Sequence, residues 1–220
     1  MGKINQGVLG PVSGKVGNVV GATWRGIDYL RILPANVHNP RTPAQTSQRA
    51  KFLLTLRFVQ PLLDFVKIGY KGYAVGMSAY NAAMSYIVKN AVIGEYPDQE
   101  IDFSKVLVSR GNLRGVVAAT ATSPEARKIQ VTWEDNSELG GASPNDTAIV
   151  VVFNGEKMDV SRSLEAGVRS DGQAEITLPT AYVGDTVQVF LAFTSISDHF
   201  YSGNRDTISN SVFAGSVVVS

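Results

Sequence analysis

Residues 39–67 read NPRTPAQTSQRAKFLLTLRFVQPLLDFVK, and they predict the central helix of the N-terminal half. Thr42 suits the N-cap, and Pro43 suits the first helical position, where its missing N–H group would have had no partner. Gln45 stands where the side chain of a capping box reaches back to the N-cap. Three neighbouring residues therefore mark the start of this helix.

Apolar side chains make most of the predicted helix hydrophobic. They recur at steps of three and four, and further apolar residues widen the stripe until little of the helix is polar. These residues are Phe52, Leu53, Leu54, Leu56, Phe58, Val59, Leu62, Leu63, Phe65 and Val66. We expect such a helix to be covered by other chain or by a partner. Pro61 removes one backbone hydrogen bond, so it predicts a kink or a break near Val59 and Gln60.

Glycines punctuate the beginning of the chain at alternating steps of three and four. They are Gly7, Gly10, Gly14, Gly17 and Gly21. In a helix each would cost roughly 1 kcal/mol relative to Ala, so an extended, closely packed backbone is favoured. The stretch GPVSGKV at 10–16 imitates a phosphate-binding loop. It has one residue too few between its glycines, and Val16 stands where Ser or Thr would bind magnesium.

Residues 18–33, NVVGATWRGIDYLRIL, predict two strands joined at Arg25-Gly26. Trp24, Tyr29 and Leu30 are the large packing groups of this hairpin. We expect the hairpin to lead directly into the central helix.

A second helix is predicted at residues 79–93, with Ser78 as its N-cap and Gly94 closing it. Four tyrosines cluster in sequence around its start. They are Tyr70, Tyr73, Tyr80 and Tyr86. Tyrosines can stack on bases or sugars, but aromatic side chains at helical spacing belong to a core far more often. The polar and acidic stretch at 95–104, EYPDQEIDFS, is typical of a linker.

Beyond the linker the hydrophobic period changes from 3.6 to 2, so the second half is predicted to be all-β. Strand-like runs occupy 128–135, 147–154, 156–162, 173–179, 185–195 and 211–220, with at least one more in 106–122. Asn154-Gly155 predicts a two-residue type I′ hairpin, and residues 170–172 predict another tight turn. The fold class is therefore α+β, with a hairpin-and-helix domain at 1–104 and an antiparallel β-sandwich domain at 105–220.

The net charge of +1 hides a difference between these two halves. Residues 1–104 carry 11 Lys/Arg against 6 Asp/Glu, a net +5, and residues 105–220 carry 9 against 13, a net −4. A basic half suits nucleic acid or an acidic partner, although its cations are dispersed, and opposite charges also suit an assembly. The longest aliphatic run, at 148–153, is too short to span a bilayer, and because residues 1–10 hold no apolar stretch we expect no signal peptide. We expect location in a virion or in the cytoplasm, and no membrane partner.

Groups with the spacing of a catalytic or metal site are missing from the sequence. His38 and His199 lie in different halves without neighbouring ligands. Asp198, His199 and Ser202 are the residue types of a triad, but they crowd into five positions. Three acids bracket a loop without matching a calcium-binding loop. They are Asp135, Glu138 and Asp146. With no Cys either, we predict no enzyme, no cofactor and no metal site.

Two resemblances together cover nearly the whole chain. The β half resembles a fibronectin type III or immunoglobulin-like domain, with Trp133 in an early strand and Tyr182 at the position of a corner tyrosine. The stretch GPVSGKVGNVVGATWRGIDYLR at 10–31, followed by NPRTPAQTSQRAKF at 39–52, resembles a family of uncharacterised proteins from Bacteroidota. Its NPRTPAQ portion also resembles proteins encoded in phage structural regions. The resemblance implies a virion or another large assembly, and no reaction.

We therefore expect a non-enzymatic structural protein, either a head or tail accessory protein of a phage virion or a component of another assembly. It would self-associate through its N-terminal half, display the β-sandwich and contact other assembly proteins, because residues 1–93 hold more apolar sequence than two helices and a hairpin can bury. The predicted interface residues are Trp24, Tyr29, Arg41, Phe52 and Phe58. The alternative is a nucleic-acid-binding accessory protein that uses dispersed cations. These are Lys15, Arg25, Arg31, Arg41, Arg49, Lys51 and Arg57.

Overall fold

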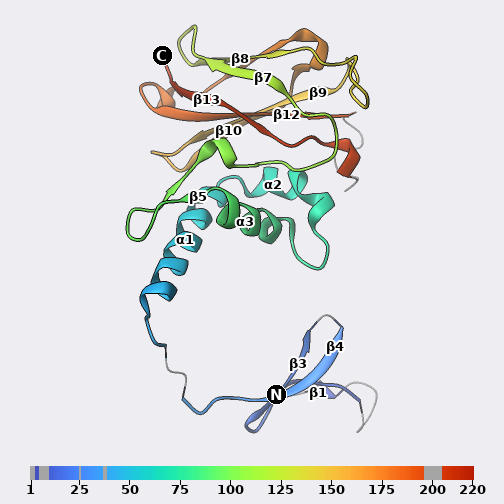
Figure 1. Ribbon diagram of the computed structural model, residues 1–220, viewed down its shortest axis with the longest axis vertical. Helices are drawn as coiled ribbons and strands as arrows, with labels where there is room; N and C mark the ends of the chain where they lie inside the picture. The colour runs from blue at the N-terminus through green and yellow to red at the C-terminus, as the bar shows by residue number, and fades with distance from the viewer. Residues whose placement is uncertain (1–2, 5–9, 25, 37–38, 196–204) are drawn as a thin grey trace. The chain divides into compact units, whose positions relative to one another are not determined.

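The structure is a computed structural model, and it describes residues 3–4, 10–24, 26–36, 39–195 and 205–220. The chain separates into two compact units, Met1–Thr42 and Pro43–Ser220. The first is a small sheet, and the second combines helices with two layers of strands (Figure 1). The division at residue 104 concerns which parts fold alone and stays a prediction. In this structure the helices that follow Thr42 group with the strands of the second half.

The N-terminal unit is an antiparallel sheet with the strand order β1-β2-β3-β4. Its strands are β1 (Lys3–Ile4), β2 (Val12–Val16), β3 (Val19–Trp24) and β4 (Ile27–Ile32). The last two form the predicted hairpin, and Gly26 in its turn has a φ of 81°, a conformation that favours glycine. At Gly21 a Cβ would lie 1.7 Å from the carbonyl oxygen of Val12, so only glycine lets these two backbones approach so closely. The extended conformation predicted for the glycine-rich segment is confirmed where the structure describes it.

The central helix is present, and it breaks at Pro61 as predicted. It consists of α1 (Pro43–Val59) and α2 (Leu63–Gly69). Between them the N–H of Leu62 donates to the carbonyl oxygen of Val59, an i to i+3 hydrogen bond that tightens the chain before α2 begins. The helix also starts at Pro43, the first helical position that the sequence predicts.

The second helix, α3 (Ala79–Asn90), begins as predicted, because the Ser78 hydroxyl accepts a hydrogen bond from the N–H of Asn81. It ends three residues before the predicted end. Residues 92–93 instead form the short strand β5 (Val92–Ile93), which pairs with β6 (Glu100–Ile101). Strand pairing has therefore replaced the last turn of the predicted helix.

Two antiparallel sheets form the sandwich, with the orders β10-β9-β12-β13 and β11-β8-β7. The strands are β7 (Val117–Thr122), β8 (Lys128–Glu134), β9 (Thr147–Asn154), β10 (Asp159–Val168), β11 (Gln173–Thr177), β12 (Thr186–Thr194) and β13 (Val212–Val218). The chain crosses between the sheets after β8, β10 and β11, as chains do in immunoglobulin-like sandwiches. The predicted fold class, α+β with a sandwich of antiparallel sheets, is confirmed.

Both faces of the four-stranded sheet are covered. Val150 and Val152 of β9 belong to the core between the two sheets, whereas Val151 and Phe153 belong to a second core that the helices share. Side chains of successive strand residues point to opposite faces, which explains why β9 is an unbroken apolar run. The helices lie against the outer face of this sheet (Figure 1).

Three polar contacts link separate parts of the sandwich. The indole N–H of Trp133 donates to the carbonyl oxygen of Arg169 at 2.8 Å, and the guanidinium of Arg169 forms a fully buried ion pair with Asp146 at 2.9 Å. Burial lowers the pKa of Arg169, and the hydrogen bond that its guanidinium donates to Asp146 opposes that shift. Tyr182 donates to a carboxylate oxygen of Asp159, and its pKa is raised by burial and by this hydrogen bond. Trp133 is buried between the sheets, and Tyr182 lies just before β12, but its hydroxyl bonds a carboxylate and not the backbone, as a corner tyrosine would.

The two-residue turn predicted at Asn154-Gly155 is wrong. Asn154 pairs with Asp159, so the loop holds four residues, 155–158. The buried Asn154 side chain accepts hydrogen bonds from the N–H groups of Glu156 and Lys157, and the chain turns around it. The tight turn at 170–172 is confirmed.

Candidate functional site

Strand pairing sorts the side chains of the N-terminal hairpin onto two different faces, because directly opposite residues of an antiparallel pair share a face. One face, called the cationic–aromatic face, holds Lys15, Val20, Ala22, Trp24, Ile27, Tyr29 and Arg31. The other, called the aliphatic face, holds Val16, Val19, Gly21, Thr23, Asp28, Leu30 and Ile32. Two faces of unlike chemistry can make two different contacts.

Apolar side chains on both faces are exposed. Trp24 is 60% exposed, Leu30 62% and Ile32 70%, and Gly21 is the only buried residue among those of this unit that the structure describes. Because the described residues of this sheet bury so little apolar surface, their own packing offsets little of the conformational entropy lost on folding.

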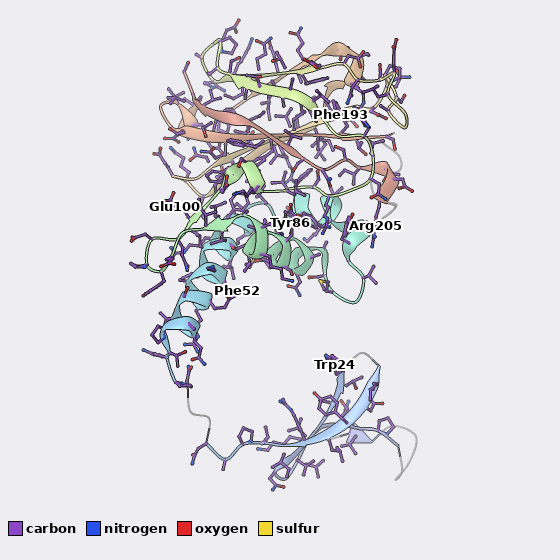
Figure 2. The ribbon with its side chains drawn as sticks, viewed as in Figure 1. Trp24, Phe52, Tyr86, Glu100, Phe193 and Arg205 are labelled. Carbon is purple, nitrogen blue, oxygen red and sulfur yellow. The ribbon has the colours of Figure 1, made fainter. Side chains whose placement is uncertain are left out.

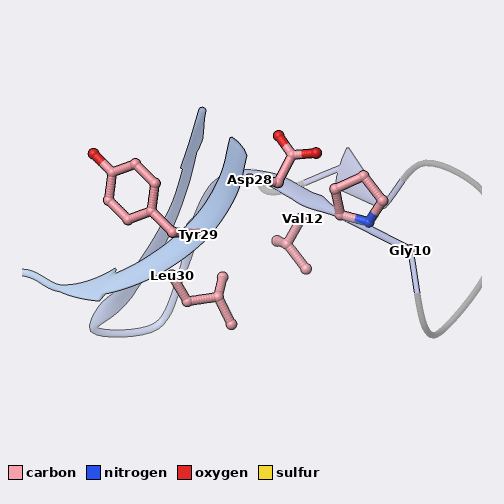
Figure 3. A pocket seen from close by; sticks show the side chains of 6 residues that line it. Gly10, Val12, Asp28, Tyr29 and Leu30 are labelled. Atoms are coloured by element: carbon pink, nitrogen blue, oxygen red, sulfur yellow. The ribbon is translucent and has the colours of Figure 1, made fainter. Parts of the chain in front are cut away.

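Residues 10–12 line a shallow hollow of about 380 Å³ together with residues 28–30 of β4 (Figure 3). In this view Leu30 and Tyr29 point away from each other. Asp28, the only acid in residues 1–42, accepts a hydrogen bond from the hydroxyl of Thr23 on the same face. The aliphatic face thus carries a single, hydrogen-bonded charge.

The five predicted interface residues fall into different environments. Trp24 and Tyr29 lie on the cationic–aromatic face, and Arg41 is exposed in the segment before α1. Phe52 is 52% exposed on α1 (Figure 2), whereas Phe58 is only 2% exposed and packs in the core of the second unit. Phe58 is therefore a core residue. The other four predicted interface residues are exposed.

A second apolar surface lies on the second unit. Phe52 and Leu53 are exposed on α1, and a groove of about 390 Å³ runs between the end of this helix, β6 and the loop 155–158. Leu54, Ile101 and Met158 contribute apolar atoms to the groove. The exposed large apolar side chains of the central helix are Phe52 and Leu53 on α1 and Leu63 at the start of α2.

The clustered tyrosines are mostly structural. Tyr70 is buried, its hydroxyl donates to the carbonyl oxygen of Leu107, and burial raises its pKa. The guanidinium groups of Arg110 and Arg205 lie 4.2 and 4.3 Å from the centroid of the Tyr73 ring. These cation–π contacts join Tyr73, which follows α2, to Arg110 in the segment before β7 and to Arg205 in the segment before β13. Tyr70 is a core residue, and the other three tyrosines pack against that core, as the helical spacing in the sequence predicts.

The residues considered for chemistry give no catalytic constellation in the described part of the chain. No group of three or more metal-binding side chains occurs there. Asp146, one of the three loop acids, is fully engaged with Arg169. His38, Asp198, His199 and Ser202 lie outside the described residues.

The aliphatic face is the feature that sequence reasoning missed. The sequence IDYLRI at 27–32 already indicates this face, because Asp28, Leu30 and Ile32 are spaced two residues apart and so lie on the same side of a strand. Assigning Val16 of β2 to the same face requires the register between β2 and β3. That register depends on the two-residue turn Gly17-Asn18, which was not predicted from the sequence.

Comparison with known proteins adds one family. A family model described as a family of unknown function matches residues 11–215. No curated protein matches the chain. Among the described residues, no helix is long and apolar enough to cross a membrane.

Proposed function

The chain belongs to that family of unknown function, DUF6266, and we propose that it is a non-enzymatic structural protein that assembles through its N-terminal unit. The observation that carries this proposal is the lack of a core in a well-formed sheet, since Gly21 alone is buried among its described residues. Folding of this sheet must be coupled to burial against another surface.

The proposed partner surface is the aliphatic face of a second copy. Two such faces bring Val16, Leu30 and Ile32 together without opposing strong charges, because Asp28 is the only charged residue on this face. Two cationic–aromatic faces would instead oppose Lys15 and Arg31 to their own copies. Self-complementary contact around a two-fold axis is the commonest way to close an oligomer.

The sandwich is then displayed or contacts a partner. Within the second unit a shared core joins the sandwich to the helices, and residues 33–42 connect that unit to the assembling sheet. The exposed Phe52 and Leu53 of α1 give the second unit a surface for other assembly proteins. The resemblance to proteins of phage structural regions supports a place in a virion, in its head or tail, or in another multi-subunit assembly.

The experiment compares molar masses by light scattering coupled to gel filtration. The full chain is expected to form an oligomer at micromolar concentration, and the fragment 43–220 is expected to be a monomer. Leu30→Ser with Ile32→Ser should weaken association, whereas Val75→Ser, at a position 73% exposed on the second unit, should not. A monomeric full chain, or an oligomeric 43–220 fragment, would refute the proposed role of the sheet.

A further inference from the structure

We propose that the cationic–aromatic face of the N-terminal sheet binds a single strand of nucleic acid. This inference goes beyond assembly and uses the opposite face of the sheet. It begins from the placement of side chains: Lys15, Val20 and Arg31 lie directly opposite one another across β2, β3 and β4. Neighbouring Cβ atoms in such a row are about 5 Å apart, so the two cations flank Val20.

Aromatic groups follow on the same face. Tyr29 stands two residues before Arg31 on β4, and Trp24 lies on β3 opposite Ile27. Two residues along a strand span roughly 7 Å, so cations occupy one end of the face and aromatic rings the other. Both rings are exposed, Tyr29 at 44%. A backbone that follows the cations would bring its bases over the rings.

The charges of the unit favour a polyanion. Residues 1–42 carry five Lys/Arg and one Asp, a net +4. That one acid, Asp28, lies on the aliphatic face with its Thr23 hydrogen bond, so nothing acidic on the hairpin opposes an anion at the cationic–aromatic face. Attraction of phosphate to such a surface is long-ranged and sequence-independent.

Exposed aromatic rings favour a single strand over a duplex or an acidic protein. Bases stack on aromatic side chains only when they are unpaired, and every base offers a face for stacking. An acidic peptide would bind through Lys15 and Arg31, and the rings of Trp24 and Tyr29 would not contribute to its affinity. The two ligands are therefore distinguishable by the contribution of the rings.

The test measures fluorescence anisotropy of a labelled ten-nucleotide oligothymidylate with the full chain. We expect a dissociation constant in the weak, non-specific range of about 10⁻⁴ to 10⁻⁶ M. Neutralisation of two phosphates predicts a loss of about sevenfold between 50 and 200 mM salt. Lys15→Gln with Arg31→Gln should remove most of this salt dependence, and Trp24→Ala should weaken binding at least about fivefold.

Matched variants separate binding from folding and from assembly. Trp24→Phe keeps a ring and should retain binding, and Val75→Ser, at an exposed position of the second unit, should leave both association and binding unchanged. Equal binding of a ten-base-pair duplex, equal competition by polyglutamate, or no effect of Trp24→Ala would overturn the proposal. Molar mass measured on the same samples shows whether a lost signal comes from failed assembly instead.

Discussion

The ring of Phe58 in α1 meets the ring of Phe153 in β9 edge-on, with the ring centroids 4.8 Å apart. Phe103, after β6, approaches both rings, so the contact joins three parts of the chain. It lies in the core that the helices share with the four-stranded sheet. The helices are therefore the third layer of the sandwich, and they cover a sheet face that a two-layer domain would expose.

Fragments of the chain should reveal this third layer. The fragment 43–220 is expected to unfold cooperatively, whereas 105–220 should be aggregation-prone because it exposes the outer face of β9 and Phe190. Thermal unfolding and binding of a hydrophobic dye measure the difference. A soluble, cooperatively folded 105–220 fragment with no dye binding would show that the predicted domain boundary at residue 104 is correct and that the helices are dispensable.

Two phenylalanines of α1 provide a matched pair. Phe58→Ala should destabilise the second unit by about 3–5 kcal/mol, because it removes a buried ring and leaves a cavity. Phe52→Ala, six residues earlier and half exposed, should change stability by no more than about 0.5 kcal/mol. Urea denaturation of the 43–220 fragment checks both. Similar losses for the two variants would contradict the placement of these rings.

Several elements follow from local chemistry, and others do not. Pro61 broke the helix because a missing N–H and a steric clash act locally. Strand β9 matched its predicted bounds because the apolar run at 148–153 leaves few alternatives. The inward-facing rings of α1 could not be chosen from sequence, since the stripe was apolar nearly all round. Phe52 and Phe58 differ only in what the rest of the chain places beside them.

The failed turn at Asn154 shows the same limit. Asn-Gly is a strong signal for a two-residue hairpin turn. Here, however, the Asn154 side chain is buried, and its amide donates a 2.6 Å hydrogen bond to Asp185, the residue just before β12. A partner 31 residues away thus decides the length of the loop. For the candidate site, the exposed aromatic residues were identified from sequence, whereas the division into two faces needed the strand register.

The buried ion pair of the sandwich makes a sharp stability prediction. Asp146→Ala should cost about 3–5 kcal/mol, because it leaves the guanidinium of Arg169 buried without its counter-charge. The double variant Asp146→Ala with Arg169→Met should be more stable than the single variant, since no unpaired charge remains. Chemical denaturation of all three proteins tests this. A single variant that costs less than about 1 kcal/mol would mean that water or another group satisfies Arg169.

Asp185 should contribute a pH-dependent part of the stability. Hydrogen bonds from Lys157 and Asn154 hold the pKa of Asp185 below its usual value. A carboxylate whose pKa is lower in the folded state than in the unfolded chain stabilises the fold at pH values above its unfolded-state pKa of about 3.9. This stabilisation is lost as the pH falls through the pKa of the folded state. Asp185→Asn should therefore lose less stability than the parent between pH 7 and pH 3 in urea titrations. Glu138→Gln, in an exposed loop, is the control, and equal pH dependence in all three would contradict the assignment.

The response to salt separates the two faces of the N-terminal sheet. Association through the aliphatic face buries Leu30 and Ile32, and hydrophobic burial survives or strengthens at high ionic strength. Sedimentation of the full chain should show an oligomer at about 0.05, 0.2 and 1 M salt, which span weak to strong screening of charges. Arg49→Ala, which removes a cation from α1, should leave the mass unchanged. Dissociation above about 0.2 M salt would instead assign the assembly to ion pairs between the basic sheet and the acidic second unit, because charged contacts weaken once the Debye length falls below about 8 Å.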